Sequence, residues 1–164
     1  MSSLGHRTSY FMGQKWAILP ESKIEGLVKM SHSGIRSVFD SFGILPTPQR
    51  LEIAGILLER PQHLSADQII ERLRSRDSAV SKATVYNTLK LFSEHGLVKE
   101  VMVDPVRKFY DSTTHPHHHF YNVDTGELSD IPDAQVSFED LPDLPAGTVR
   151  ESIEVLIKVR DRTE

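Results

Sequence analysis

The sequence predicts an α+β protein in which a helical head, closed by a β-hairpin, precedes a small and mainly antiparallel β unit. Apolar residues recur at helical spacing from Gly34 to His95. Two strand-like runs then flank a turn at Asp104-Pro105, and further short strands are expected from His117 onwards. A chain of 164 residues has room for one such head and a small second unit, each with a modest core.

Four helices are expected in the head, and their ends carry recognisable signals. Thr47-Pro48 supplies an N-cap and a proline at the first helical position. Ser65 and Gln68 have the spacing of a capping box, Ser81 is a further N-cap, and Gly96 suits a left-handed C-cap. The expected helices cover residues 34–42, 48–60, 66–76 and 81–95.

Strands follow the fourth helix. Residues 97–103 and 106–111 are typical of a two-stranded hairpin, and helices followed by such a hairpin form the winged version of the helix-turn-helix. Residues 117–123 and 127–131 are expected to form a second hairpin around a turn at Asp124-Thr125-Gly126. Apolar and polar residues then alternate over residues 149–160, which predicts a final strand.

These elements divide the chain into three parts. Residues 1–32 form an N-terminal extension, residues 33–112 the winged helix, and residues 113–164 a dimerisation and ligand-sensing unit. The last part is expected to form a homodimer, because its alternating strand exposes an apolar row that a small sheet cannot cover alone.

The composition excludes several kinds of site. The chain has no cysteine, which rules out disulfides, a four-cysteine structural zinc site and cysteine nucleophiles, so any metal must be held by imidazole and carboxylate. Because neither a membrane-spanning apolar run nor a secretory signal is evident, we expect a cytoplasmic protein without a membrane partner. The net charge is −4, but residues 101–164 hold thirteen Asp/Glu against six Lys/Arg, which leaves a positive balance in residues 1–100.

The outward face of the fourth helix combines hydroxyl, amide and basic side chains. Hydroxyls and lysines reach phosphates, whereas an amide can pair with adenine in the major groove. Together with the wing and the charge balance, this face predicts binding of double-stranded DNA. The expected DNA-binding residues are Arg50, Ser81, Lys82, Thr84, Tyr86, Asn87 and Lys90.

A run of histidines opens the second hairpin. In a strand, His117 and His119 lie on one face about 6 to 7 Å apart, so both imidazoles can meet one ion while His118 points away. Two aspartates near the strand ends offer oxygen ligands, and a histidine at the helix-loop-helix junction lies where a ligand spanning both domains would sit. Such a set suits Fe, Mn, Zn or Co. The predicted metal ligands are His63, Asp111, His117, His119 and Asp130.

An enzymatic role is not indicated. A metalloenzyme needs an open coordination position, a water-activating base and a walled substrate pocket, and no residue pattern signals them. The sequence also has no Ser-His-Asp order, phosphate-binding glycine loop or dinucleotide fingerprint. A regulator that responds to a bound ligand is the favoured interpretation.

Several short stretches, taken together, resemble the ferric uptake regulator family over residues 34–131. These stretches are His63–Gln68, Ala83–Leu89, Gly96–Val98, His117–His119 and Asp124–Gly126. The Tyr86-Asn87 pair, residues 110–121 and residues 128–132 are similar to the iron response regulator branch of that family. This second likeness extends almost to Arg162.

The resemblance implies a homodimer whose winged helices bind a palindromic operator and whose regulatory metal site uses the five residues named above. It implies a metal- or haem-responsive DNA-binding transcriptional regulator of iron and haem homeostasis genes. In the iron response branch the histidine run is associated with haem. His117, His118 and His119 are therefore candidate haem-binding residues, with haem or a haem-delivering protein as a further partner.

The sequence departs from the family pattern at three points. The CxxC structural zinc is absent, so stability must come from packing and dimerisation. Asn87 stands where an arginine is common, and no ligands for a further family metal site follow Pro132. Aspartate at both 111 and 130 is also similar to the peroxide-sensing branch, in which metal-bound peroxide oxidises a histidine ligand. A peroxide-sensing repressor is therefore the alternative interpretation.

Overall fold

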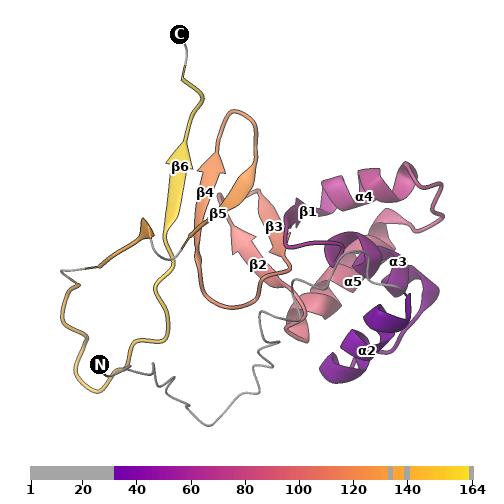
Figure 1. Cartoon of the computed structure of the whole chain (residues 1–164), viewed down its shortest axis with the longest axis horizontal. Helices are drawn as coiled ribbons and strands as arrows, with labels where there is room; N and C mark the ends of the chain where they lie inside the picture. Colours follow the sequence, from indigo (N-terminus) through magenta and orange to yellow (C-terminus); the bar gives the residue numbers. More distant parts are fainter. Residues whose placement is uncertain (1–31, 133–134, 139–140, 163–164) are drawn as a thin grey trace, which may run out of the picture.

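The computed structural model describes residues 32–132, 135–138 and 141–162. Figure 1 shows helices with a short sheet on one side of the molecule and a second sheet beside them. The helices are α2 (His32–Phe42), α3 (Pro48–Leu57), α4 (Ala66–Arg74) and α5 (Lys82–Glu94). The strands are β1 (His63–Ser65), β2 (Lys99–Met102), β3 (Lys108–Asp111), β4 (His118–Asn122), β5 (Leu128–Ile131) and β6 (Leu156–Val159). The predicted α+β winged helix followed by a small β unit is confirmed, while residues 1–31 of the expected extension lie outside the described residues.

The helices begin where the sequence signals them. Thr47 Oγ1 accepts the amide of Arg50 at 3.3 Å and so opens α3. At α4 both halves of the capping box are present, because the Ser65 hydroxyl accepts the Gln68 amide and the Gln68 side chain accepts the Ser65 amide. An N-cap of this kind stabilises a helix by roughly 1 kcal/mol. After α5, Gly96 has a φ of +72°, the left-handed conformation of a C-cap.

Most apolar side chains of the helices lie in one core. Phe39 of α2 and Phe92 of α5 are fully buried, with ring centroids 5.4 Å apart, and Ile53 and Ile69 are buried beside them in the same cluster. Burial of one such side chain stabilises the fold by about 1.5–3 kcal/mol. This packing holds α5 against α3 and α4. None of the helices in the described part of the chain is long and apolar enough to cross a membrane.

A three-stranded sheet in the order β1-β3-β2 closes the head. β2 and β3 form the predicted wing, but the expected helix-loop-helix junction at His63 is wrong, because His63–Ser65 pairs antiparallel with β3. Three residues are too few to show a period of two in the sequence. In this ladder His63 lies opposite Asp111.

The second sheet has the order β5-β4-β6. β4 and β5 form the predicted antiparallel hairpin, whereas β6 pairs with β4 in parallel. The predicted strand over residues 149–160 is wrong in its length, because only Leu156–Val159 is paired. The partner strand β4 has five residues, and a strand cannot pair beyond the end of its neighbour.

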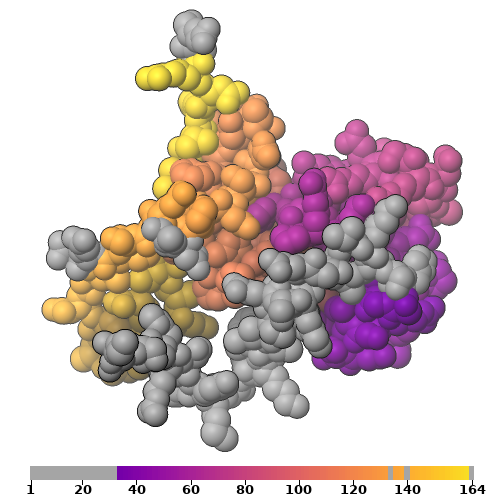
Figure 2. Space-filling model, viewed as in Figure 1, coloured from indigo at the N-terminus to yellow at the C-terminus, as the bar shows by residue number. Residues whose placement is uncertain are grey.

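The two sheets share a second, smaller apolar cluster. Val103 and Phe109 of the wing pack with Tyr121 and Leu128 of the hairpin. Arg107 of the wing donates a hydrogen bond to the Tyr121 hydroxyl. The head and the second sheet are therefore in direct contact, and Figure 2 shows the two as lobes that meet. The division at residue 112 into two domains stays a prediction.

Candidate metal centre

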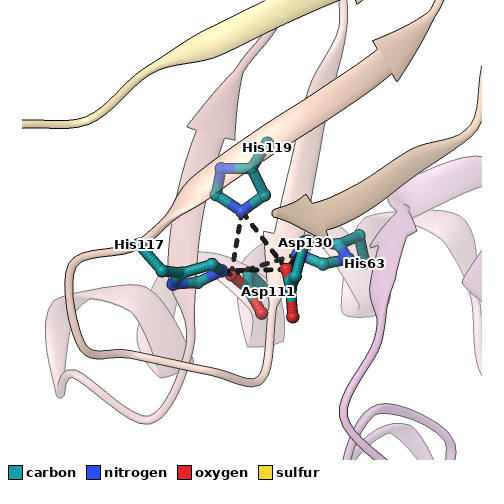
Figure 3. Close-up of side chains that lie close together, drawn as sticks. All are labelled: His63, Asp111, His117, His119 and Asp130. Carbon is teal, nitrogen blue, oxygen red and sulfur yellow. Dashed lines mark hydrogen bonds and ion pairs between the residues drawn. The ribbon is translucent and has the colours of Figure 1, made fainter. Parts of the chain in front are cut away.

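Five side chains converge between the two sheets (Figure 3). They are His63 of β1, Asp111 at the end of β3, His117 just before β4, His119 of β4 and Asp130 of β5. One nitrogen or oxygen atom from each residue lies within 4.8 Å of those of all the others. The structure therefore brings together all five residues that the sequence suggested as metal ligands.

Strand pairing explains how residues far apart in the sequence meet. His63 lies opposite Asp111 in the β1-β3 ladder, and His119 lies opposite Asp130 in the β4-β5 ladder. Each sheet thus supplies one His–Asp pair. His117 lies two residues before His119 and so faces the same way. A shift of either register by one residue would turn one member of its pair to the other face of the sheet.

The imidazole nitrogens lie close to both carboxylates. His117 Nε2 is 3.1 Å from Asp111 Oδ2 and 3.0 Å from Asp130 Oδ1. The distances from His63 Nε2 to the same two oxygens are 3.3 and 2.9 Å, and those from His119 Nε2 are 3.5 and 3.7 Å. Ligand atoms that share one ion at about 2.1 Å are about 3.0 Å apart at octahedral angles and about 3.4 Å apart at tetrahedral angles. The observed separations lie close to these values.

The cluster is buried on all but one side. The Asp111 side chain is 0% exposed and the three histidine side chains are at most 6% exposed, whereas 43% of the Asp130 side chain is accessible. The cluster therefore opens to solvent past Asp130.

The residues present fit a divalent metal ion. Three buried atoms, His63 Nε2, His119 Nε2 and Asp111 Oδ2, lie at ion-pair distance from other atoms of the cluster but make no contact with hydrogen-bond geometry. Leaving a buried polar atom without a partner costs roughly 1–3 kcal/mol. A single ion would satisfy all three atoms. Three imidazoles and two carboxylates form a donor set suited to Fe, Mn, Zn or Co.

Neighbouring main-chain groups orient two of these ligands. His117 Nδ1 donates to the His115 carbonyl at 2.8 Å, so its Nε2 faces the carboxylates. Asp111 Oδ1 accepts the Thr113 amide at 2.7 Å, which leaves Oδ2 for the centre. Such contacts behind a metal ligand fix its orientation and, for histidine, the position of the ring proton.

Two buried groups of the cluster, His117 and Asp111, stabilise each other's charge. Burial opposes a positive charge on His117, but the nearby Asp111 carboxylate and the His115 carbonyl outweigh it and raise the pKa of His117 to about 9. Burial also opposes the charge of Asp111, but the imidazoles of His117, His119 and His63 lower the pKa of Asp111 well below its ordinary value. A proton and a metal ion therefore compete for His117 Nε2.

His118 lies outside this cluster. Its Nδ1 accepts the Val155 amide at 3.2 Å, and its ring lies against Phe138 with centroids 5.5 Å apart. The three histidines suggested for haem thus divide into two that face the carboxylates and one that holds the segment before β6. The sequence predicts that His118 points away from the pair, and the alternation of side chains along the strand is the reason.

The residues suggested for DNA binding lie around α5. Lys82, Tyr86, Asn87 and Lys90 are exposed on its outer face. The remaining three have structural contacts as well: the Ser81 hydroxyl caps α5 by accepting the Thr84 amide, and Arg50 donates to the Leu45 carbonyl at 2.8 Å.

A shallow hollow of about 240 Å³ lies between the start of α3 and this face of α5. Arg50, Thr84 and Asn87 line it together with Thr47, Gln49 and Thr88, which are not among the DNA-binding residues expected from the sequence. The sequence contains a signal for these residues, because Thr47-Pro48 marks a helix start and the main-chain amides at a helix start favour anions such as phosphate.

A winged helix beside a buried His/Asp cluster is the architecture of a metal-responsive transcriptional regulator. Residues 41–141 match the sequence model of the Ferric uptake regulator family, and the chain belongs to this family. Because members of the family are transcriptional regulators, the interpretation as a regulator and not an enzyme is confirmed.

The relatives include peroxide-responsive repressors. The repressor PerR of Staphylococcus epidermidis is 34% identical over 89 residues, which cover 54% of this chain and 59% of the relative. PerR of Staphylococcus aureus strain Mu50 is 35% identical over 89 residues, 54% of this chain and 60% of the relative. The matched region therefore spans about three fifths of these curated relatives.

Solved structures of the family share the fold. The ferric uptake regulator of Pseudomonas aeruginosa, determined with manganese, has a TM-score of 0.60 and 25% identity, covering 78% of this chain and 98% of that one. The Vibrio cholerae ferric uptake regulator has a TM-score of 0.57 and 23% identity, covering 76% and 99%. These comparisons identify the family, and the iron response branch stays a prediction.

Proposed function

We propose that this chain is a metal-responsive, DNA-binding transcriptional regulator that acts in the cytoplasm as a homodimer. The convergence of five ligand side chains from both units supports this most directly. His63 and Asp111 come from the sheet that closes the winged helix, whereas His117, His119 and Asp130 belong to the second unit. Iron, manganese or zinc is the proposed ion.

The metal centre would couple the two units. A bound divalent ion would place positive charge between the two carboxylates. It would also accept a nitrogen lone pair from each of the three histidines. His63 and Asp111 then hold the edge of the head against the β4-β5 hairpin, so any arrangement that separates the units loses these bonds. Because an ion shifts the arrangement only by its differential affinity, ion binding and DNA binding must affect each other reciprocally.

The outer face of α5 is proposed to enter the major groove of double-stranded DNA. Lys82 and Lys90 are exposed and are proposed to contact phosphates, together with Arg50, which lines the hollow at the start of α3. Tyr86 and Asn87 are exposed between the two lysines, where their side chains can meet base edges. Ser81 and Thr84 complete the set at the start of the helix, where amides favour phosphate.

A binding selection tests this function. Duplexes are selected from a random library by the full chain, with Mn²⁺ and with EDTA, and the affinity of a selected duplex is then measured by fluorescence anisotropy. We expect Mn²⁺ to change the Kd at least tenfold in the wild type but not in the His117→Ala/His119→Ala variant. His115→Ala is the matched control, because this exposed histidine is not one of the five candidate ligands: the variant keeps the carbonyl that accepts from His117 and loses only a ring contact with His117, with centroids 5.3 Å apart. Failure to select any duplex overturns the DNA-binding role, and an unchanged response in the double variant overturns the site.

Haem is an alternative regulatory ligand to a metal ion. With haem as the ligand, the regulator would control iron and haem homeostasis genes. Its support is the histidine run, from which the imidazole of His117 or His119 would hold the haem iron. His118 is held by the Val155 amide and would have to leave it to join them. A Soret shift on adding haem, lost in the double variant, would support haem or a haem-delivering protein as a partner.

A peroxide-sensing repressor is the second candidate function. Two observations favour it: the ligand set holds carboxylates at both Asp111 and Asp130, and the PerR repressors are among the relatives. Protein loaded with Fe²⁺ and exposed to hydrogen peroxide would then gain one oxygen atom on His63, His117 or His119, detected by peptide mass spectrometry. The Mn²⁺ form should not gain it.

A further inference from the structure

A cleft adjoins the candidate metal centre, and the function proposed above assigns no ligand to it. Its volume is about 510 Å³, within the range of small-molecule sites. One wall belongs to the head and the other to the β4-β5 hairpin. His63 and Asp130 line the cleft and are also members of the five-residue cluster. The cleft is therefore continuous with the side on which the cluster opens to solvent.

The head wall carries an oriented guanidinium group. Arg72 Nη1 donates to Gln62 Oε1 at 2.9 Å, and the buried Gln62 is itself held by donating to the Ile56 carbonyl at 2.6 Å. Within the described residues, neither Arg72 nor the neighbouring Arg60 forms an ion pair with a carboxylate. An arginine fixed in this way, with N–H groups to spare, is suited to a carboxylate ligand.

The hairpin wall has the opposite charge. Glu127 and Asp130 line it, so an anion that entered alone would be attracted at one end and repelled at the other. A divalent ion held by Asp111 and Asp130 would cancel the charges of these two carboxylates, so that Glu127 alone keeps a negative charge on this wall. The cleft then offers guanidinium groups at one end and, at the other, an ion whose five protein ligands leave a sixth position for one more oxygen, which suits a ligand with a carboxylate at each end.

We propose that this cleft binds a small dicarboxylate. One carboxylate pairs with Arg72 and Arg60, and the other is drawn to the ion on the open side of Asp130. The inference rests on the proposed metal-responsive function. Because the two walls belong to different units, a ligand that touches both favours the arrangement in which they meet and so adds a second input to the regulator.

Succinate is the probe, because it has two carboxylates and binds free divalent ions too weakly to strip the protein. It is titrated by calorimetry into the full chain loaded with Co²⁺ and into the chain kept in EDTA, while the visible Co²⁺ spectrum is recorded. We expect at least tenfold tighter binding to the Co²⁺ form, with a change in its spectrum. Acetate and inorganic phosphate should bind at least tenfold more weakly than succinate.

Arginine variants locate the binding. Arg72→Gln should weaken succinate binding at least tenfold while the Co²⁺ spectrum without succinate stays that of the wild type. Arg74→Gln is the matched control, because Arg74 lies on the same helix, is exposed and does not line the cleft. If Arg72→Gln does not fold, Arg60→Gln gives the same test, since Arg60 is exposed and has no contact with Gln62 of the kind that Arg72 makes.

The possible outcomes separate this inference from the proposed function. If Co²⁺ binds and alters DNA affinity but succinate does not bind, or binds equally to Arg72→Gln, the dicarboxylate site is wrong and the metal-responsive function stands. Equal affinity for succinate, acetate and phosphate also overturns the dicarboxylate assignment. Failure of Co²⁺ to bind the chain overturns the metal centre and this inference together.

Discussion

His63 faces Asp111 across the β1-β3 ladder, two residues before Ser65 caps the start of α4. This one cross-strand pair connects the candidate metal centre to the helices of the head, because α4 in turn packs against α5. A displacement of His63 must therefore be taken up by α4 or by its contact with α5. The candidate metal centre is therefore linked to α5, the helix proposed to face DNA, through packed structure.

Replacing Asp111 or Asp130 by asparagine should reduce the free energy of unfolding by unequal amounts. Asp111→Asn removes a fully buried charge beside His117 and should lower the free energy of unfolding by about 3 kcal/mol at pH 7 in EDTA. Asp130→Asn should cost less than about 1 kcal/mol, because this carboxylate is 43% exposed. Urea denaturation followed by circular dichroism measures both. Equal losses would contradict the burial argument.

Stability without metal should depend on pH through His117. Its folded pKa of about 9 lies above the ordinary value of 6.5, so the contribution is fully present below pH 6.5 and is lost as pH rises through 9. We expect the free energy of unfolding in EDTA to fall by up to about 3 kcal/mol between pH 6.5 and 9.5. The His117→Gln variant should show a flatter curve. Parallel curves for the two proteins would exclude His117 as the source.

Metal affinity should have the opposite pH dependence. An ion must displace the proton that Asp111 helps to hold on His117, so the affinity for Mn²⁺ should rise about tenfold per pH unit from pH 7 towards 9. Competition with a fluorescent chelator at each pH measures this slope. An affinity that is already constant above pH 7 would show that His117 is not a ligand or is not protonated.

The helices and the two hairpins were predictable because their signals are local. The Ser65–Gln68 capping box, the Ser81 N-cap and Gly96 each act within one turn of the helix end they mark. The placement of His117 and His119 on one face likewise follows from the alternation of side chains along one strand. Such features need no knowledge of the rest of the chain.

The remaining features depend on contacts between distant segments. β1 has three residues and exists as a strand because β3 lies beside it, so its pairing of His63 with Asp111 has no local signal. Likewise, β6 is limited by the length of β4 and not by its own alternation, which continues through residues 149–155. The cleft beside Asp130 is formed by two units and could not be inferred from either.

Removing one exposed lysine of α5 should weaken DNA binding in a salt-dependent way. The Lys90 side chain is 75% exposed and has only a distant pairing with Glu94, at 3.7 Å, so it is available to a phosphate. Lys90→Ala should reduce the slope of log K against log salt by about one charge, measured with the selected duplex. Lys158→Ala, on the second sheet, is the control and should keep the wild-type slope. Wild-type affinity and slope in Lys90→Ala would remove this face from the interface.

The outer face of the second sheet is the proposed surface for a second copy of the chain. Leu156 packs into the apolar cluster shared with the wing, so its neighbour Ile157 points to the opposite face and is 40% exposed. Ile157 lies beside Phe120 in the β4-β6 ladder, which makes a small apolar patch there. Phe138, Leu141, Leu144 and Val149 of the segment before β6 are also exposed.

An acidic residue in this patch should separate the copies. Ile157→Asp places a charge where an apolar contact would be desolvated, so sedimentation velocity should show a monomer at concentrations where the wild type is a dimer. Leu45→Asp is the matched control, because Leu45 is 76% exposed between α2 and α3 in the helical head. It should leave the dimer intact. If Ile157→Asp sediments as the wild-type dimer does, the copies meet elsewhere and the outer face of this sheet has a different partner.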